Sequence, residues 1–484
     1  MKLIAFYLPQ FHPIKENDEW WGKGFTEWTN VTKSKPLFEG HYQPHLPSEL
    51  GFYDLRLPSV MEEQSKLAKK YGIDAFCYYH YWFNEKLLLE KPIEMMLENP
   101  NVETSFCLCW ANENWSRRWD GKEKEILISQ NYETYSAKKH MDWLIPYFND
   151  PRYLKIDGKP IFLVYSAMDI ENLKSIIAEW NEYSIGAGFE GIYTVAANTN
   201  YNKLTYDELI ELGFNAIYNF EPKSFKGSKT LNVGLTKTDV YNYKSFVDTS
   251  LNMEYPENLT IFPTVFPNWD NTARRRENAI VIQNEDPNEY SYWLYKSMEK
   301  VKNYETEKQI VFINAWNEWA EGAHLEPDMK NGKLYLEATL ETKNNFTNGE
   351  YLVKDYTGIK NKKELNKSIY LEPETPLYIW GAGKRGIATF DKLPIKTNFV
   401  GFIDSNVEKH NSLIEGYSVF NWLLDNRFIT SSNPMILIAS AYEDEIMELI
   451  QQYGFEDGKN YTNKLNVKWT NIEGKRCMEI YDFV

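Results

Sequence analysis

The sequence is poor in cysteine, and this shortage excludes two classes of protein. Its 484 residues include only four cysteines, too few for a disulfide framework in a chain of this length. Cys107 and Cys109 are two residues apart, so on a strand they share one face, and no second pair of Cys or His has the spacing of a zinc site. We therefore expect buried, reduced thiols, no metal ion and a cytoplasmic location.

Basic charge and long apolar runs are also scarce. The chain has 53 Lys and Arg against 69 Asp and Glu, a formal net charge of −16. Such a surface repels nucleic acid and acidic lipid, so we expect neither as a partner. No apolar run approaches the roughly 18 residues of a membrane helix, and the apolar start of the chain is too short for a signal peptide. We expect no integral membrane segment, and the sequence leaves the oligomeric state open.

Eight short runs rich in β-branched and aromatic residues alternate with helical patterns through the first two-thirds of the chain. The runs are 2–8, 74–80, 104–111, 160–166, 191–198, 215–220, 260–266 and 309–316. Strands that alternate with helices indicate parallel βαβ units, and eight units predict a (β/α)₈ TIM barrel over residues 1–345. The alternative is an open sheet of seven or nine strands.

A second, smaller domain follows the predicted barrel. Apolar periodicity fades over residues 346–370, a polar stretch rich in Lys and Asn that we assign as a linker. Strand and helix patterns then resume over residues 371–484. This second alternation predicts a Rossmann-like α/β domain.

Three glycines in that domain have the spacing of a dinucleotide fingerprint. Gly381, Gly383 and Gly386 directly follow a predicted strand and open a helix, and Asp404 ends the next strand. In this context glycines let the backbone approach a phosphate, and the acidic residue binds a ribose hydroxyl. The turn is therefore a candidate site for a nucleotide or nucleotide-sugar cofactor. The alternative is a glycine turn that only packs the helix on the strand.

Aromatic residues make up 16% of the chain, and many of them directly follow the predicted barrel strands, where TIM barrels place their active sites. Flat rings among polar side chains suit a sugar, because its C–H face stacks while its hydroxyls find hydrogen-bond partners. We therefore predict a carbohydrate cleft. Its expected substrate-binding residues are His12, Trp28, Tyr79, His80, Trp82, Trp110, Asn112, Glu113, Trp115, Trp269, Trp316 and Asn317. Alternatively, the rings cap the barrel interior and the histidines are structural.

Two carboxylates stand three residues apart in the segment 317–322, in a tight turn after the eighth predicted strand. Glycoside cleavage needs such a pair, one protonated and one ionised, and closeness in a pocket would drive their pKa values apart. We therefore predict that Glu318 and Glu321 are catalytic, with a solvated helical face as the alternative. His324 and Glu326 follow and are expected to support the pair.

Arg274, Arg275 and Arg276 follow the seventh predicted strand. Such a run could meet an anionic sugar, but consecutive charges are more typical of a solvated face, and we assign them no role.

Several segments resemble a known family. Residues 6–13, 20–28, 41–45 and 110–115 are similar to the WbsX-like family, bacterial proteins of lipopolysaccharide and capsule gene sets that are related to glycoside hydrolase family 99. The resemblance covers about residues 1–345. The C-terminal domain resembles the small Rossmann-like modules appended to bacterial glycan-assembly enzymes.

The Asn-Glu-Trp-x-Glu-Gly motif of that hydrolase family matches residues 317–322. The resemblance implies a metal-free, retaining, endo-acting α-mannosidase on a (β/α)₈ barrel. Glu318 would take the proton of the sugar 2-hydroxyl, which then attacks the anomeric carbon. Glu321 would protonate the departing oxygen and afterwards activate water.

The leading hypothesis is therefore a retaining glycoside hydrolase that acts on an α-linked glycan in lipopolysaccharide or capsular polysaccharide metabolism. The alternative is a glycosyltransferase of surface-polysaccharide biosynthesis. Against it, no two aspartates are two residues apart, whereas sugar-nucleotide enzymes commonly use an Asp-x-Asp metal clamp. A third hypothesis is a non-catalytic glycan-binding scaffold.

Overall fold

A computed structural model of the chain forms two compact units, Met1–Ile359 and Lys360–Val484. In the first unit the structure describes residues 1–117, 122–201, 203–225, 228, 230–231 and 237–349. In the second it describes residues 369–371, 375–391, 393, 399–410, 412–422, 424–425, 434–440, 443–451, 455, 461–462, 466–472 and 475–481. Most of the predicted linker, residues 350–368, lies outside the described residues.

The first unit is a closed barrel of parallel strands, which confirms the predicted (β/α)₈ fold. Its strands are β1 (Lys2–Tyr7), β2 (Ala75–Phe83), β4 (Ser105–Trp110), β8 (Lys159–Val164), β9 (Tyr193–Asn198), β10 (Ala216–Asn219), β12 (Ile261–Phe262), β13 (Thr264–Val265) and β16 (Ile310–Ile313). Neighbouring strands pair in the order β12-β10-β9-β8-β4-β2-β1-β16-β13.

Pro263 explains why eight barrel strands are recorded as nine segments. It alone separates β12 from β13, and a proline has no N–H to donate to a sheet. β12 pairs with β10 and β13 pairs with β16, both in parallel. The Pro263 carbonyl still accepts the N–H of Phe312 at 2.9 Å. The two segments are halves of one strand that closes the barrel, so the structure excludes the open sheet.

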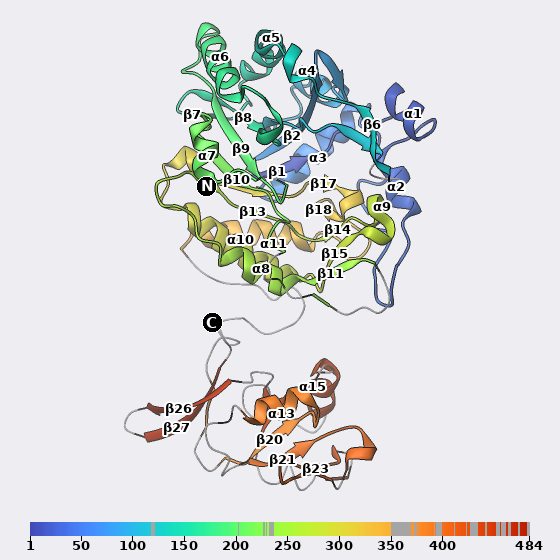
Figure 1. Ribbon diagram of the computed structural model, residues 1–484, viewed down its shortest axis with the longest axis vertical. Coiled ribbons are helices and arrows are strands. Elements are labelled where there is room, and N and C mark those ends of the chain that lie inside the picture. The colour runs from blue at the N-terminus through green and yellow to red at the C-terminus, as the bar shows by residue number, and fades with distance from the viewer. Residues whose placement is uncertain are drawn as a thin grey trace. The chain divides into compact units, whose positions relative to one another are not determined.

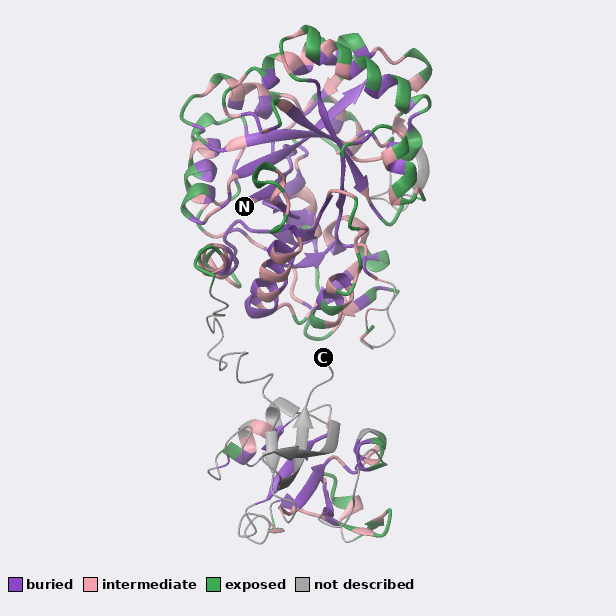
Figure 2. Ribbon diagram, turned by 90° about the vertical axis from the view of Figure 1, so that its left-hand side faces the viewer, coloured by how far each residue is buried: buried purple, intermediate pink, exposed green. Residues whose placement is uncertain are grey.

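A helix follows each barrel strand and packs on the outside (Figure 1). The helices are α3 (Pro58–Lys70), α4 (Lys91–Glu98), α5 (Ala137–Phe148), α6 (Leu173–Gly186), α7 (Tyr206–Glu211), α8 (Tyr243–Leu251), α10 (Pro287–Val301) and α11 (Leu334–Thr347). Figure 2 shows buried strands inside and helices exposed on their outer faces. All nine residues of β2 are buried, as expected for a strand covered by side chains of the barrel interior on one face and by helices on the other.

Short elements between the barrel strands and their helices carry most of the site residues. They include α1 (Lys15–Trp21), α2 (Glu27–Lys33), β3 (Lys86–Leu88), β5 (Trp115–Arg117), β6 (Lys122–Ile128), β11 (Asp239–Asn242), β14 (Trp269–Asp270), α9 (Thr272–Arg275), β15 (Ile280–Gln283), β17 (Asn317–Glu318) and β18 (Ala323–His324). A small hairpin, β7 (Lys155–Ile156) with β8, lies at the start of the fourth barrel strand.

The second unit contains a six-stranded sheet in the order β22-β23-β21-β20-β24-β25. The strands are β20 (Leu377–Trp380), β21 (Phe399–Ile403), β22 (Leu413–Ile414), β23 (Tyr417–Phe420), β24 (Met435–Ile438) and β25 (Tyr461–Thr462). All neighbours are parallel except β22 with β23. A separate antiparallel sheet joins β19 (Ile369–Leu371), β26 (Asn466–Ile472) and β27 (Lys475–Tyr481).

Both faces of the six-stranded sheet are buried. Successive side chains of a strand point to opposite faces, and Leu377 and Ile379 belong to one apolar cluster while Tyr378 and Trp380 belong to another. The first cluster includes Phe390 of α13 (Lys384–Asp391), and the second includes residues of α15 (Glu443–Gln451). The sheet therefore has a helix on each face, as in the expected α/β domain.

Two expectations from composition concern thiols and membrane helices. Cys77, Cys107 and Cys109 are free and buried. Of the helices in the described part of the chain, none combines the length and the apolar character that crossing a membrane requires.

Candidate active site

The two predicted catalytic glutamates lie on a tight hairpin that follows β16. β17 and β18 pair antiparallel, with Glu318 opposite Ala323, and a 3₁₀ turn over Trp319–Glu321 connects them. Asn317 anchors the hairpin to the first barrel strand: its Oδ1 accepts the N–H of Leu8 at 2.7 Å, and its Nδ2 donates to the Leu8 carbonyl at 3.0 Å. The motif is therefore built into the mouth of the barrel.

Gly322 allows the hairpin to turn against β14. It adopts the left-handed conformation, with φ +64°, which glycine tolerates and other residues rarely adopt. A Cβ at this position would lie 2.8 Å from the backbone nitrogen of Asp270. The final glycine of the motif is thus required both by conformation and by close packing.

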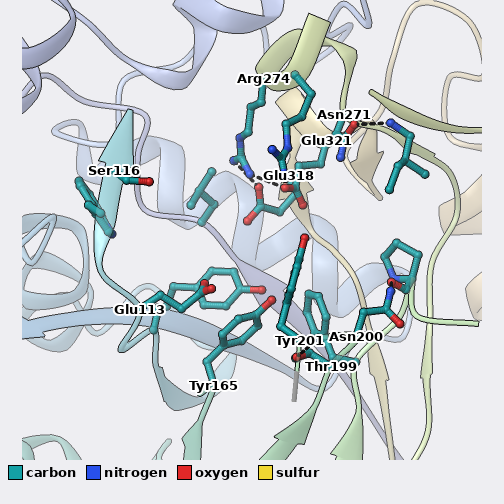
Figure 3. A pocket seen from close by; sticks show the side chains of 18 of the residues that line it. Glu113, Ser116, Tyr165, Thr199, Asn200, Tyr201, Asn271, Arg274, Glu318 and Glu321 are labelled. Carbon is teal, nitrogen blue, oxygen red and sulfur yellow. Dashed lines mark hydrogen bonds and ion pairs between the residues drawn. The ribbon is translucent and has the colours of Figure 1, made fainter. Parts of the chain in front are cut away.

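Arg274 joins the two glutamates. Its Nη2 lies 2.6 Å from Oε2 of Glu318 and its Nη1 lies 2.7 Å from Oε1 of Glu321. Its Nε donates to Oε1 of Glu27, the first residue of α2, at 2.7 Å. The side chain of Arg274 is 13% exposed and that of Glu27 is fully buried. One guanidinium thus holds three carboxylates. Figure 3 shows the two that belong to a single hairpin, Glu318 and Glu321.

The electrostatics of this cluster distinguishes Glu318. Burial raises the pKa of Glu318, Arg274 opposes that rise, and the neighbouring Glu321 and Glu27 add to it, so that the pKa is about 8. Burial also raises the pKa of Glu27, again against the influence of Arg274. The Glu318 side chain is 6% exposed and that of Glu321 is 21% exposed. Glu318 is therefore the more enclosed carboxyl, with a pKa above that of an ordinary glutamate.

These groups line a cavity of about 330 Å³ at the carboxyl ends of the barrel strands. Every barrel strand contributes to its lining, directly or through the segment that follows it. From β1 to β16, one lining residue for each strand is Gln10, Tyr79, Glu113, Tyr165, Asn200, Phe220, Trp269 and Glu318. Figure 3 shows Arg274 with Glu318 and Glu321 on one side, and Glu113, Tyr165 and Tyr201 facing them.

Six of the fourteen predicted catalytic and substrate-binding residues line this cavity, together with residues that we had not selected. The predicted residues that line it are Tyr79, Glu113, Trp115, Trp269, Glu318 and Glu321. The lining residues not selected from the sequence include Gln10, Trp21, Tyr81, Tyr165, Asn200, Tyr201 and Arg274. The lining therefore combines rings, amides, hydroxyls and charges.

The other eight predicted substrate-binding residues do not line the cavity, and this corrects the sequence-based assignment. They are His12, Trp28, His80, Trp82, Trp110, Asn112, Trp316 and Asn317. Each is buried. Their side chains pack within the barrel wall and its loops, which was the alternative interpretation of the aromatic residues.

In three of these eight residues, a polar side-chain atom contacts a backbone carbonyl. Nδ1 of His12 lies 3.0 Å from the Pro9 carbonyl. Trp28 donates to the Tyr53 carbonyl at 2.9 Å, and Asn112 donates to the Ser166 carbonyl at 2.8 Å. These bonds hold loop backbone at the barrel mouth.

Four more form a buried aromatic layer or a core contact. His80 stacks on Trp143 with ring centroids 4.3 Å apart, and Trp82 stacks on His140 at 4.6 Å. Trp110 donates to the Trp82 carbonyl at 3.2 Å, and the ring of Trp316 lies 5.0 Å from that of Phe76. The alternation of aromatic residues along β2 and β4 therefore reflects core packing as much as a cleft.

Arg274 and Glu27 are the members of the charged cluster around the two glutamates that sequence analysis did not select. Arg274 begins a run of three arginines, a pattern that favoured a solvated face, and it lies 247 residues from Glu27 in the chain. The position of Arg274 just after the seventh barrel strand, where an active-site loop begins, was a usable signal that it belongs to the site.

Glu326 supports the hairpin that bears Glu318 and Glu321, as expected. It accepts hydrogen bonds from Trp319 Nε1 at 2.7 Å, Tyr53 Oη at 2.9 Å and Gln64 Nε2 at 2.6 Å. The ring of Trp319 in turn stacks on His324 at 3.9 Å. The turn that bears both glutamates thus rests on a buried carboxyl and an imidazole.

In the second unit, the glycine turn has the close contacts of a dinucleotide fingerprint. A Cβ on Gly386 would lie 1.7 Å from the Gly381 carbonyl oxygen, whereas a Cβ on Gly383 would meet nothing within 4 Å. Asp404 accepts the N–H of Ala382 at 2.8 Å and lies 3.0 Å from Lys409 Nζ. Asp404 therefore holds the turn itself, and nucleotide binding stays a prediction.

Two curated relatives match the first part of the chain, both described as uncharacterized protein WxcX of Xanthomonas campestris pv. campestris. The protein of strain B100 is 40% identical over 343 residues, which cover 70% of this chain and 49% of that protein. The protein of a second strain is 41% identical over 342 residues, with the same coverage. The chain thus spans about half the length of the curated relatives it matches.

Solved structures with a related architecture include two of the GH99 endo-alpha-mannosidase from Bacteroides thetaiotaomicron. One has a TM-score of 0.47 and the other, in complex with bis-tris propane, a TM-score of 0.48. Both are 15% identical in sequence, and each alignment covers 72% of this chain and 97% of the other.

The family itself is settled by sequence. A family model described as glycosyltransferase WbsX matches residues 3–339, which include nearly all of the barrel and both glutamates of the hairpin. The resemblance noted from the motifs of the first 345 residues is thereby confirmed. The chain belongs to the WbsX glycosyltransferase family.

Proposed function

We propose that this protein is a retaining glycoside hydrolase that cleaves an α-linked glycan of a bacterial surface polysaccharide. The observation that carries the proposal is that Glu318 and Glu321 line one cavity and bind opposite ends of the same guanidinium. Two carboxyls in different environments are what glycoside cleavage requires. The family description, glycosyltransferase WbsX, fits a role in glycan metabolism.

In the proposed reaction Glu318 is the base. Its carboxylate takes the proton of the sugar 2-hydroxyl, the 2-oxygen bonds to the anomeric carbon, and the bond to the departing oxygen breaks. A pKa of about 8 makes Glu318 a stronger base toward a hydroxyl than an ordinary glutamate, although only about a tenth of it is ionised at pH 7.

Glu321 is the acid in the same step and gives its proton to the departing oxygen. Its carboxylate then takes a proton from water, whose oxygen bonds to the anomeric carbon while Glu318 returns its proton to the 2-oxygen. The two inversions restore the starting configuration. The greater exposure of Glu321, 21% against 6% for Glu318, supports this division, because the second step needs water at Glu321.

The remaining lining supports a sugar as the ligand. Gln10 Nε2 and Trp269 Nε1 are buried donors with no hydrogen-bond partner among the described residues, and both residues line the cavity. An unsatisfied buried donor costs about 1–3 kcal/mol, which a ligand hydroxyl would recover. Tyr79, Tyr165 and Trp269 supply rings on which the sugar stacks.

The family description favours glycosyl transfer as the second candidate. The same intermediate would serve it, because a sugar hydroxyl in place of water would form a new glycosidic bond. Hydrolysis remains the proposal, since transfer from a nucleotide sugar commonly uses an Asp-x-Asp motif that the sequence lacks.

The test is to incubate the full chain with α-linked mannosides and other α-glycosides, without any nucleotide sugar, and to follow released sugar. We expect product whose first anomer retains the configuration of the substrate by NMR. Glu318→Gln and Glu321→Gln should each lower kcat/KM by about 10²–10⁴-fold. Glu182→Gln, a change on the exposed face of α6, is the matched control and should retain full activity.

Three other outcomes would each contradict the proposal. Turnover that appears only with a sugar nucleotide would support the transferase. An inverted first product would exclude the 2-hydroxyl route. Glycan binding without turnover, unchanged in both glutamine variants, would support the hypothesis of a non-catalytic scaffold.

A further inference from the structure

Beside the active site, one group of three buried side chains in the described part of the chain could hold a metal ion. His45, His324 and Asp328 each place a ligand atom within 4.8 Å of the other two. None of the three is more than 5% exposed. None lines the cavity that contains Glu318 and Glu321.

The distances suit a single ion. Nδ1 of His45 lies 3.1 Å from Nε2 of His324, which lies 3.8 Å from Oδ2 of Asp328. Atoms bound to one tetrahedral ion at about 2.0–2.1 Å are about 3.3 Å apart. The two imidazoles already have about this separation, and Oδ2 of Asp328 lies about half an ångström beyond it from Nε2 of His324.

Other bonds orient the ligand atoms. Nδ1 of His324 lies 3.1 Å from the Glu326 carbonyl, so it carries the proton and Nε2 presents its lone pair to the group. Asn331 donates its backbone N–H to Oδ1 of Asp328 and its side-chain amide to Oδ2 at 3.3 Å. Metal-binding histidines and carboxylates are commonly held by such second contacts.

Backbone hydrogen bonds join the segment that contains His45 to the segment that contains Asp328. Met329 donates to the Leu46 carbonyl at 2.9 Å, and Ser48 donates to the Pro327 carbonyl at 3.0 Å. His324 belongs to β18, which pairs with β17 of the catalytic hairpin. The three side chains are thus placed by fixed backbone and not by mobile loops.

We propose that His45, His324 and Asp328 bind one Zn²⁺ ion, which ties the catalytic hairpin to the loop after β1. Two imidazoles with one carboxylate suit Zn²⁺ and similar transition ions and do not suit Mg²⁺ or Ca²⁺. His45 also lines a separate cavity of about 180 Å³, which leaves room for water as a fourth ligand. Ligation through Nδ1 of His45 moves the imidazole proton to Nε2 by exchange with solvent.

The competing explanation is a hydrogen bond between two neutral imidazoles, and the chain contains a matched control for it. Nε2 of His80 lies 2.8 Å from Nε2 of His140, and both histidines are buried. In the described part of the chain this second pair is not joined by a carboxylate within metal-binding distance. A histidine pair without an acid should not bind Zn²⁺.

The experiment uses the full chain, free of any polyhistidine tag and stripped with a chelator that is then removed. Titration with ZnCl₂, followed by elemental analysis after dialysis, should show one Zn²⁺ per chain, and MgCl₂ should not bind. His45→Gln and Asp328→Asn should each weaken Zn²⁺ binding by at least about 100-fold, while His80→Gln binds as the parent does. Zn²⁺ should raise the Tm of the parent and of His80→Gln, but not that of His45→Gln.

A measurement on the unaltered chain guards against variants that fail to fold. Co²⁺ added in place of Zn²⁺ should give the visible absorption of a tetrahedral site. The proposal is overturned if the parent binds no Zn²⁺, if Co²⁺ gives no such absorption, or if a folded His45→Gln binds as the parent does. None of these readouts depends on glycoside cleavage, so the proposed function stands or fails separately.

Discussion

At the scale of single residues, Arg274 controls the charge of the site. It neutralises part of a cluster of three carboxylates that would otherwise repel one another in a buried space. It lowers the pKa of Glu318 against the combined influence of burial, Glu321 and Glu27. Arg274 is therefore a positioning residue that also sets the working pH.

The pH dependence of the reaction follows from the raised pKa of Glu318. A base must be ionised, and the ionised fraction of Glu318 grows as pH rises through about 8. Because Glu321 must at the same time hold the proton that it donates, we expect a bell-shaped dependence of kcat/KM on pH with one limb near pH 8, as measured by initial rates between pH 5 and 9.5. A profile without a limb near pH 8 would exclude Glu318 as a group that titrates in the catalytic step.

Arg274→Met should shift that profile. Without the guanidinium, the pKa of Glu318 loses the influence that lowers it, so the limb near pH 8 should move to higher pH. We expect kcat/KM at pH 7 to fall by about 10²–10³-fold. The control is Arg276→Met, an exposed neighbour in the same run, which should leave the profile unchanged. An unshifted limb in Arg274→Met would limit the arginine to a structural role.

At the scale of elements, the hairpin β17–β18 is the unit that turns a sequence motif into a site. Asn317 fixes its start to Leu8, Glu326 and His324 support its turn through Trp319, and Gly322 packs it against Asp270. The short spacing of the two glutamates is productive because these contacts hold the turn at the barrel mouth.

Gly322→Ala tests this packing. The left-handed conformation and the close approach to Asp270 should together lower the free energy of unfolding by about 1–3 kcal/mol and displace the glutamates. Chemical denaturation and kcat/KM would measure both effects. Gly51→Ala is the matched control, because Gly51 has φ +61° but no atom within 4 Å of a Cβ. Equal losses of activity in the two variants would argue against a role for hairpin packing.

At the scale of the whole molecule, the chain divides into two units with separate cores. The barrel core and the two apolar clusters of the second unit share no residue. All residues that line the proposed active site belong to the first unit. The cavity is therefore lined within the first unit.

Residues 1–349 alone should consequently fold and retain the activity of the full chain within about twofold. Calorimetry of the full chain should show two transitions, one of which matches the fragment. Release of sugar by the fragment and by the full chain, at equal concentration, measures the comparison. A fragment that folds but has lost activity would show that the second unit acts on the barrel.

The sequence by itself determined the eight barrel strands, the second α/β domain, the family and the pair of glutamates. These features are encoded locally, because the pattern of apolar residues reports burial and the spacing of Glu318 and Glu321 spans a single turn. Even the interruption at Pro263 falls within the strand predicted over 260–266.

Only the tertiary structure decided which distant side chains meet. Glu27 and Arg274 are 247 residues apart, and His45 and His324 are 279 apart, so no local pattern links them. The same holds for the tryptophans that pack in the wall while others line the cavity. Strand pairing and the paths of the loops settle such meetings, because closing a barrel brings together the ends of strands that the sequence keeps far apart.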